Sequence, residues 1–285
     1  MPELPEVETV RRGLAPVLEG ETFTRVHLRR KDLRKPFPKG FAKRLEGARV
    51  VQVVRRAKYL IVKTQKGAAR DVLIWHLGMS GQVRIYKVGE SVPRPGKHDH
   101  VEFEISSGAR LVFTDPRRFG LMDLCPAQDL ADHVLLKAIG PEPLGNEFNG
   151  PVLAAALKGK RVAVKQAIMD ARVVAGVGNI YASEALFRAK ISPKRTAATV
   201  QGGRAEKLAD AIKAVLRAAI DAGGSTLRDH RTTDGGLGYF QFNFHVYGRA
   251  GEACPGCDCE ISRTGGIQRL EQGGRSTYYC PRKQK

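Results

Sequence analysis

The chain of 285 residues lacks the features that mark a secreted or membrane protein. It holds no apolar run of the length that a bilayer-spanning helix needs, and its first residues lack the apolar core of a signal peptide. It has only five cysteines, and four of them follow residue 253, so they do not form a disulfide framework spread over the chain. These absences lead us to expect a cytoplasmic protein with no membrane partner.

Acidic residues are also scarce, since 29 Asp and Glu stand against 48 Lys and Arg, giving a net charge of +19. Such a surplus favours a polyanionic partner, and DNA or RNA is the commonest one. General solubility and affinity for anionic lipid are the alternatives. A hydrophobic content of 42% indicates a globular chain, and its length suits one large domain or two to three small ones.

The spacing of apolar residues divides the chain into a β-rich part and a helical part. Residues 5–14 have the pattern of a short amphipathic helix, and several short strands after it suggest a sandwich or barrel. Residues 231–246 are typical of a loop and connector. The predicted strands are 49–54, 59–63, 72–76, 82–86, 100–105 and 110–114, and the later helices are 151–157, 162–171, 180–189 and 205–222.

The N-terminus offers a reactive pair, because removal of Met1 leaves the amine of Pro2 beside the carboxylate of Glu3. An α-amine has a reference pKa of about 7.7–8.0, so much of it is neutral and nucleophilic near neutral pH. Attack of this secondary amine on a sugar C1′ would give an iminium, and Glu3 can move protons beside it. The alternative is a simple helix start, with Pro5 at the first helical position.

Two further segments have patterns suited to nucleic acid. Gly176 and Gly178 separate two predicted helices and would let the backbone approach a phosphate, although an ordinary helical hairpin has the same pattern. Met79 and Phe119 are large apolar residues in loops flanked by Gly or Pro. Proteins that kink duplex DNA insert such wedges between base steps; packing beneath the loops is the alternative.

The C-terminal cysteines have the spacing of a metal-binding hairpin. Cys254 and Cys257 form a C-x-x-C pair that can share one tetrahedral zinc ion with Cys280, whereas Lys283 occupies the place of a fourth cysteine. Cys259 is the remaining thiol nearby. Buried structural thiols without metal are the alternative.

Six segments together resemble the formamidopyrimidine-DNA glycosylase family of bacterial 8-oxoguanine repair. They lie in the order of the family and extend from Pro2 to Cys280. The segments are PELPEVETV (2–10), RRAKYL (55–60), HLGMSG (76–81), DPRRFG (115–120), AGVGNIYASE (175–184) and GRSTYYC (274–280).

This resemblance implies an α+β multidomain fold. An N-terminal β-sandwich with the terminal helix is expected over residues 1–130, and a helix–two-turns–helix DNA-binding domain over 131–235. A zinc-ribbon-like hairpin is expected over 246–285. The implied partner is double-stranded DNA with oxidised purines, bound by a monomer in the bacterial cytoplasm, associated with the nucleoid when on DNA.

The resemblance also implies roles for individual residues. Pro2 would attack C1′ of the damaged nucleotide with Glu3 as proton donor, after which Lys58 would serve β-elimination and Arg275 δ-elimination. Residues 235–242 would close over the damaged base. The residues that would fill the space of the flipped base are Met79, Arg117 and Phe119, with Arg117 facing the opposite cytosine, and the DNA-contacting positions are His98, Arg117, Arg161, Lys165 and Asn179.

One zinc ion per chain with a structural role is expected at Cys254, Cys257 and Cys280, with Cys259 as fourth ligand and His245 as its alternative. Lys283 stands where a fourth cysteine would be expected, and this affects both which residues hold the zinc and how rigidly Arg275 is held. Two other functions stay open: an endonuclease VIII-like glycosylase for oxidised pyrimidines, and a catalytically silent relative that binds lesions.

Overall fold

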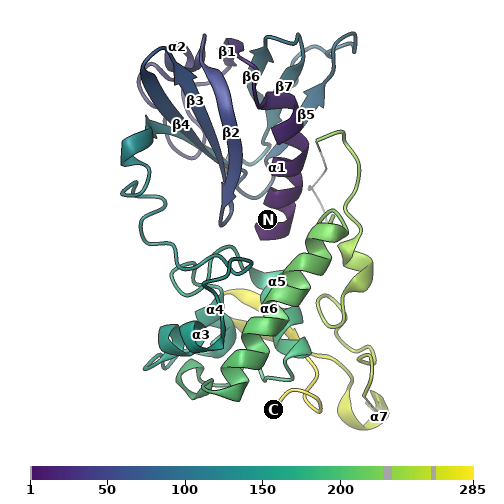
Figure 1. Ribbon diagram of the computed structural model, residues 1–285. Coiled ribbons are helices and arrows are strands. Elements are labelled where there is room, and N and C mark those ends of the chain that lie inside the picture. Colours follow the sequence, from purple (N-terminus) through teal and green to yellow (C-terminus); the bar gives the residue numbers. More distant parts are fainter. Residues whose placement is uncertain (1, 227–232, 258–260) are drawn as a thin grey trace. The chain divides into compact units, whose positions relative to one another are not determined.

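The computed structural model describes residues 2–226, 233–257 and 261–285, and the chain groups into two compact units (Figure 1). The first unit comprises Met1–Lys137 and Ala222–Tyr239, and the second comprises Ala138–Asp221 and Phe240–Lys285. Within the described ranges, no helix is both long and apolar enough to cross a membrane.

The first unit is a β-sandwich, which confirms the predicted fold class. Its two antiparallel sheets have four strands each, in the orders β1-β6-β7-β5 and β2-β3-β4-β8. The six predicted strands are present, and β1 and β8 are two more that the pattern did not single out. The strands are β1 (Phe23–Leu28), β2 (Arg49–Arg56), β3 (Tyr59–Lys66), β4 (Ala69–His76), β5 (Gln82–Tyr86), β6 (Asp99–Ile105), β7 (Arg110–Thr114) and β8 (Leu121–Pro126), and the short helix α2 (Phe41–Leu45) follows β1.

Aromatic side chains join the two sheets. Trp75 of β4 lies with its ring centroid 5.6 Å from that of Phe103 and 5.4 Å from that of Phe113, both from the other sheet. Phe103 in turn packs against Phe23 at 5.3 Å. All four rings are buried, and this burial drives the sheets together.

The terminal helix α1 spans Leu4–Leu18 and is longer than the predicted 5–14. It continues because Leu14 and Leu18 extend the apolar face that begins with Val7 and Val10, and all four are buried. Pro16 lies in the last turn of the helix. The apolar face packs against β2 and β3, which fixes the N-terminal residues on the sandwich (Figure 1).

The second unit combines helices with a two-stranded hairpin. Its helices α3 (Gly150–Leu157), α5 (Asn179–Arg188) and α6 (Gly203–Asp221) agree closely with the predicted ranges, and α6 packs against both α3 and α5. The hairpin consists of β9 (Gln268–Gln272) and β10 (Arg275–Tyr279). The remaining helices are α4 (Val164–Ile168) and the short α7 (Ile261–Thr264).

The helix predicted over 162–171 is shorter than expected, since α4 covers Val164–Ile168 only. The residues before it are extended, because Ala163 forms a β-bridge with Thr196 and the Val164 N–H donates to the carbonyl of Arg195 (2.7 Å). These long-range backbone bonds outweigh the local helical pattern.

Candidate functional site

The predicted reactive terminus lies at the start of α1. Glu3 is the N-cap residue, and it forms a reciprocal capping box with Glu6, in which the Glu3 N–H donates to Glu6 Oε2 (2.8 Å). Pro2 and Glu3 are both buried, with Glu3 3% exposed. The Pro2-Glu3 pair is therefore held in one orientation by the first turn of the helix.

Glu6 lies at the same terminus and was not among the predicted site residues. Its second oxygen, Oε1, accepts a hydrogen bond from the Ser225 N–H (2.8 Å), and the side chain is 2% exposed. One carboxylate thus connects the terminus with a residue 219 positions away in the sequence. The motif PELPE contained Glu6, but no local pattern predicts a partner at this separation.

Lys58 lies in the tight turn between β2 and β3. The preceding Ala57 has a left-handed backbone (φ 51), and its carbonyl accepts a hydrogen bond from Arg55 Nη1 (3.0 Å). His76 lies at the end of β4, and the positive charge of Lys58 acts on its ring. Burial, with the charges of Lys58 and Arg34, lowers the pKa of His76 to about 4, so its ring is neutral at pH 7.

The ring of His76 is also fixed in orientation. Its Nδ1 accepts a hydrogen bond from the Gly78 N–H (2.9 Å), and the ring packs against Tyr59 with centroids 4.9 Å apart. A neutral imidazole that accepts at Nδ1 carries its proton on Nε2. His76 is a second residue that sequence reasoning did not assign.

The two loops with the predicted wedge residues are bonded to each other through Asp115. This fully buried carboxylate accepts hydrogen bonds from Ser80 Oγ (2.6 Å) and from the Gly120 N–H (2.7 Å). The loops also touch closely, because a Cβ at Gly78 would lie 2.3 Å from the carbonyl carbon of Phe119. Gly78 has φ +70, which further favours glycine there.

The structure brings the predicted wedge and DNA-contact residues of these loops near one another. The Arg117 guanidinium lies over the Phe119 ring (4.8 Å to the centroid), and both side chains are exposed. The Arg117 N–H donates to Ser80 Oγ, one residue after the half-buried Met79. His98 adjoins the same loop, since the Asp115 N–H donates to its carbonyl (3.0 Å).

In the second unit, Lys165 and Asn179 lie together at the hairpin. The Lys165 ammonium donates to Asn179 Oδ1 (2.6 Å), to Thr277 Oγ1 (2.7 Å) and to the carbonyl of Ser276 (3.1 Å). Lys165 is 1% exposed, whereas Asn179, the first residue of α5, is partly exposed. The structure thus joins α4, α5 and β10 through one buried ammonium.

The other two predicted cations of this unit are exposed. Arg161 lies before α4, and Arg275 begins β10 after the turn Gly273-Gly274, whose backbones are both left-handed (φ 58 and 71). Arg275 pairs with Gln272 in the hairpin register. Its side chain therefore projects from the end of a regular two-stranded ribbon.

Glu184 is a further residue that sequence reasoning missed. Its buried carboxylate, on α5, accepts hydrogen bonds from the N–H groups of His245, Val246 and Tyr247 (2.9, 3.0 and 2.8 Å). It fixes the connector to the hairpin on α5. Tyr247 in turn reaches the DNA-contact candidate Asn179 through a 3.4 Å hydrogen bond.

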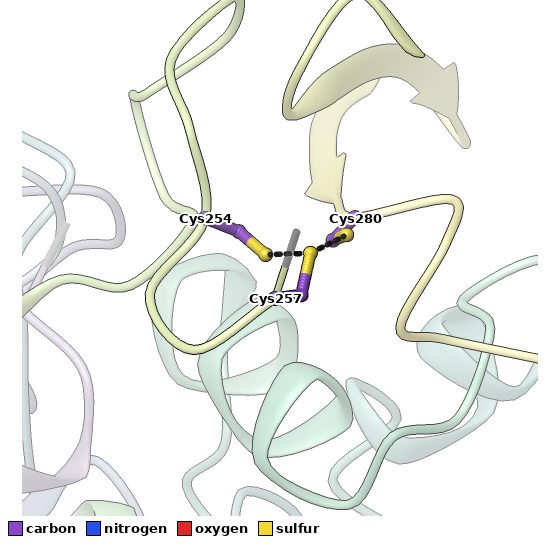
Figure 2. Close-up of side chains that lie close together, drawn as sticks. All are labelled: Cys254, Cys257 and Cys280. Atoms are coloured by element: carbon purple, nitrogen blue, oxygen red, sulfur yellow. Dashed lines mark hydrogen bonds between the residues drawn. The ribbon is translucent and has the colours of Figure 1, made fainter. Parts of the chain in front are cut away.

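The thiols of Cys254, Cys257 and Cys280 form a group that can hold a metal ion (Figure 2). Their sulfurs all lie within 4.8 Å of one another, with 2.9 Å between those of Cys254 and Cys257. Burial, together with its interaction with Cys280, raises the pKa of the Cys254 thiol to about 11. A metal would therefore have to displace the proton of the Cys254 thiol.

The donor chemistry fits zinc for three positions of a tetrahedral site. The predicted fourth ligand, Cys259, lies outside the described residues. His245, its alternative, is engaged elsewhere: its Nδ1 lies 3.2 Å from Glu184 Oε2, and its ring stacks on Phe187 with centroids 5.5 Å apart. It does not belong to the described group of thiols.

Comparison with known proteins identifies similar chains over the full length. Residues 1–122 match the family model for the formamidopyrimidine-DNA glycosylase N-terminal domain, and residues 139–231 match that for its H2TH domain. A formamidopyrimidine-DNA glycosylase of Rhodospirillum rubrum is 54% identical, with 100% of both chains covered. One from Beijerinckia indica is 53% identical, also with 100% of both chains covered.

Solved structures agree with these matches. The Lactococcus lactis Fpg in complex with DNA containing an abasic site has a TM-score of 0.87 at 33% identity, with 100% of both chains covered. The MutM (Fpg) protein of Thermus thermophilus has a TM-score of 0.85 at 38% identity, covering 99% of this chain and 98% of the other. A MutM complex with DNA containing carbocyclic 8-oxo-G has a TM-score of 0.87 at 33% identity, with 100% of both chains covered.

Proposed function

This chain belongs to the formamidopyrimidine-DNA glycosylase family and is a DNA glycosylase of base-excision repair, and we propose that it removes oxidised purines through a Schiff base on Pro2. The substrate is double-stranded DNA carrying 8-oxoguanine or a formamidopyrimidine. The observation that carries the proposal is the buried Pro2-Glu3 pair at the start of α1, oriented by the Glu6 carboxylate.

The first step uses the terminal amine and the carboxyl group beside it. With Met1 removed, the lone pair of the Pro2 nitrogen attacks C1′ as the bond from C1′ to the base breaks. The glycosidic electron pair leaves with the base, which takes a proton from Glu3. The Pro2 nitrogen then gives up its own proton, and the C1′–O4′ bond breaks as O4′ takes up a proton, which leaves the iminium on Pro2. The capping box supports this assignment, because it fixes the Glu3 backbone next to the nucleophile.

A lyase activity follows from the same intermediate. The iminium acidifies the hydrogen on C2′, so loss of that proton expels the 3′-phosphate in β-elimination, and a second elimination expels the 5′-phosphate. We assign proton transfer in the first elimination to Lys58 and in the second to Arg275. Lys58 is supported by its position in a tight turn, and Arg275 by its exposed place at the end of the hairpin.

The damaged base must leave the helix before any of these steps, which costs a few kcal/mol. Met79, Arg117 and Phe119 would fill the vacated space, with Arg117 facing the opposite cytosine. The Arg117–Phe119 stacking and the exposure of both residues support this role. Phosphates would be contacted through His98, Arg161 and Asn179. Lys165 would not contact a phosphate itself, because its ammonium already binds three protein oxygens. It would instead support Asn179, one of those three partners.

We also assign one zinc ion to Cys254, Cys257 and Cys280. The three soft thiolates would hold it at the base of the hairpin, and Cys259 remains the proposed fourth ligand. When bound, the ion would cross-link the 254–257 loop and the segment after β10. It takes no part in the glycosylase chemistry, which we place on Pro2 and Glu3.

Borohydride trapping on an 8-oxoguanine:cytosine duplex tests the proposed mechanism. Reduction of the iminium should link the DNA to the N-terminal peptide, and Glu3→Gln should lower trapping on 8-oxoguanine more than on a preformed abasic site. A cross-link that maps to Lys58 would refute the assignment of Pro2. A parallel duplex with thymine glycol separates this substrate class from oxidised pyrimidines, and no trapping on any duplex would indicate a binding protein without catalysis.

A further inference from the structure

Lys283 makes a contact that a cysteine at this position would not make. Its ammonium donates a hydrogen bond to the carbonyl of Pro255 (3.0 Å), inside the loop between Cys254 and Cys257. The same ammonium lies over the Phe187 ring, 4.7 Å from its centroid. The side chain therefore ties the C-terminal segment both to the C-x-x-C loop and to α5.

The segment that carries Lys283 is fixed by several hydrogen bonds besides the one from the Lys283 N–H to Cys280 Sγ (3.4 Å). Gln284 is 3% exposed, and its amide oxygen accepts from the Cys280 N–H (2.8 Å) while its amide nitrogen donates to the carbonyl of Ile191 (2.9 Å). The backbone of Lys285 adds bonds of 3.2 Å to Lys190 and to Ser192. This places the base of Lys283 firmly against the segment that follows α5.

The cysteines themselves lie in an apolar environment. Cys254 and Cys280 are buried in one cluster with Phe187, Val246 and Ile267. A free cysteine behaves there as a small apolar side chain and contributes by packing. At its other end the hairpin is bonded to Lys165 through β10. Packing and hydrogen bonds thus hold both ends of the hairpin.

We propose that Lys283 is a metal-independent tether between the C-terminal segment and the 254–257 loop, so that the hairpin β9–β10 keeps its shape when the cysteines hold no ion. A four-ligand zinc site would cross-link the 254–257 loop to the segment after β10. Lys283 makes the same cross-link through the Pro255 carbonyl and the Phe187 ring. The inference concerns the hairpin alone, so it stands or falls independently of the borohydride experiment.

The test compares the full chain with Lys283→Met, Lys283→Cys and the control Lys194→Met, before and after zinc removal with a chelator. Lys194 is a matched control because its ammonium also lies over a ring of this unit, Tyr279 at 5.2 Å. Zinc content, amide hydrogen exchange over residues 268–279 and the melting temperature are measured for each protein.

In the stripped wild type and the stripped control, we expect the hairpin amides to keep most of their protection. Stripped Lys283→Met and stripped Lys283→Cys should both lose it, because neither side chain replaces the ammonium that donates to the Pro255 carbonyl. The proposal is overturned if stripped wild type loses protection as completely as stripped Lys283→Met, or if stripped Lys283→Met keeps it. If Lys283→Met does not fold, Lys283→Arg, which retains a cation, must restore protection in the stripped state.

Discussion

The buried ammonium of Lys165 allows a direct distinction between a phosphate contact and an internal support. Replacement with Met leaves an unbranched side chain one heavy atom shorter and removes the charge and all three hydrogen-bond donors. The Lys165 ammonium is 1% exposed and donates to Asn179, Ser276 and Thr277. We therefore expect Lys165→Met to loosen the hairpin and to leave the number of phosphate contacts unchanged.

The expected loss of stability follows from the acceptors that remain. The Ser276 carbonyl keeps a hydrogen bond from Asn179 Nδ2 (3.0 Å), and the Thr277 hydroxyl keeps its bond to Gln272 Oε1 (3.0 Å). Within the described part of the chain, Asn179 Oδ1 has Lys165 as its one donor. A single acceptor left without its donor costs about 1–3 kcal/mol, so we expect about 2 kcal/mol.

Denaturant unfolding and hydrogen exchange over residues 275–279 measure the loss of stability, and duplex binding at several salt concentrations measures the phosphate contacts. The slope of log affinity against log salt should be unchanged in Lys165→Met. Exposed Arg161 is the contrast, since Arg161→Gln should reduce the slope by about 0.9. Unchanged hairpin protection in Lys165→Met, together with a slope reduced by about 0.9, would refute the reasoning.

Three further predictions concern the first unit. Glu6→Gln should reduce base excision and lower the free energy of unfolding by about 1–3 kcal/mol. A glutamine amide has one oxygen, so it cannot accept from the N–H groups of both Glu3 and Ser225 as the carboxylate does. Base excision at the wild-type rate would contradict this. Gly78→Ala should lower the free energy of unfolding by at least about 1–3 kcal/mol and weaken discrimination of the base opposite the lesion. The reason is that its Cβ would lie 2.3 Å from the carbonyl carbon of Phe119. An unchanged melting temperature would count against this. For His76, whose pKa falls from 6.5 to about 4, the unfolded chain binds the proton more readily, so stability should drop by up to about 3 kcal/mol as pH falls from 6.5 to 4. His76→Asn should reduce this pH dependence in denaturant titrations.

The sequence predicted the parts of the fold that depend on local pattern. The strand runs alternate or are continuously apolar, so their ranges could be read directly from the sequence. Residues 162–163 were misassigned to a helix because their backbone bonds are made with residues 196 and 197. No local pattern encodes such a partner.

The candidate site also contains some residues that local pattern reveals and others whose contacts are nonlocal. Phe119 could be singled out as a candidate because a large apolar side chain in a polar loop is unusual for its surroundings, whereas Arg117 was proposed from the family resemblance alone. Lys165 was identified as a phosphate contact, but its burial could not be foreseen, since it follows from acceptors more than 100 positions later. The contact between Lys283 and Pro255 is also nonlocal, since the two residues are 28 positions apart.

A common physical arrangement links the residues that the sequence reasoning left out or misplaced. Glu6, Asp115, Lys165 and Glu184 are all buried, and each makes two or more hydrogen bonds, at least one of them to a segment distant in the chain. Burying a charge is expensive, so these groups contribute less to net stability than their bonds suggest. Their effect is orientation: each fixes a backbone at or next to a proposed site residue. Substitution of these four should therefore impair substrate positioning more than its effect on stability alone would predict, whereas substitution of the exposed residues should remove single contacts.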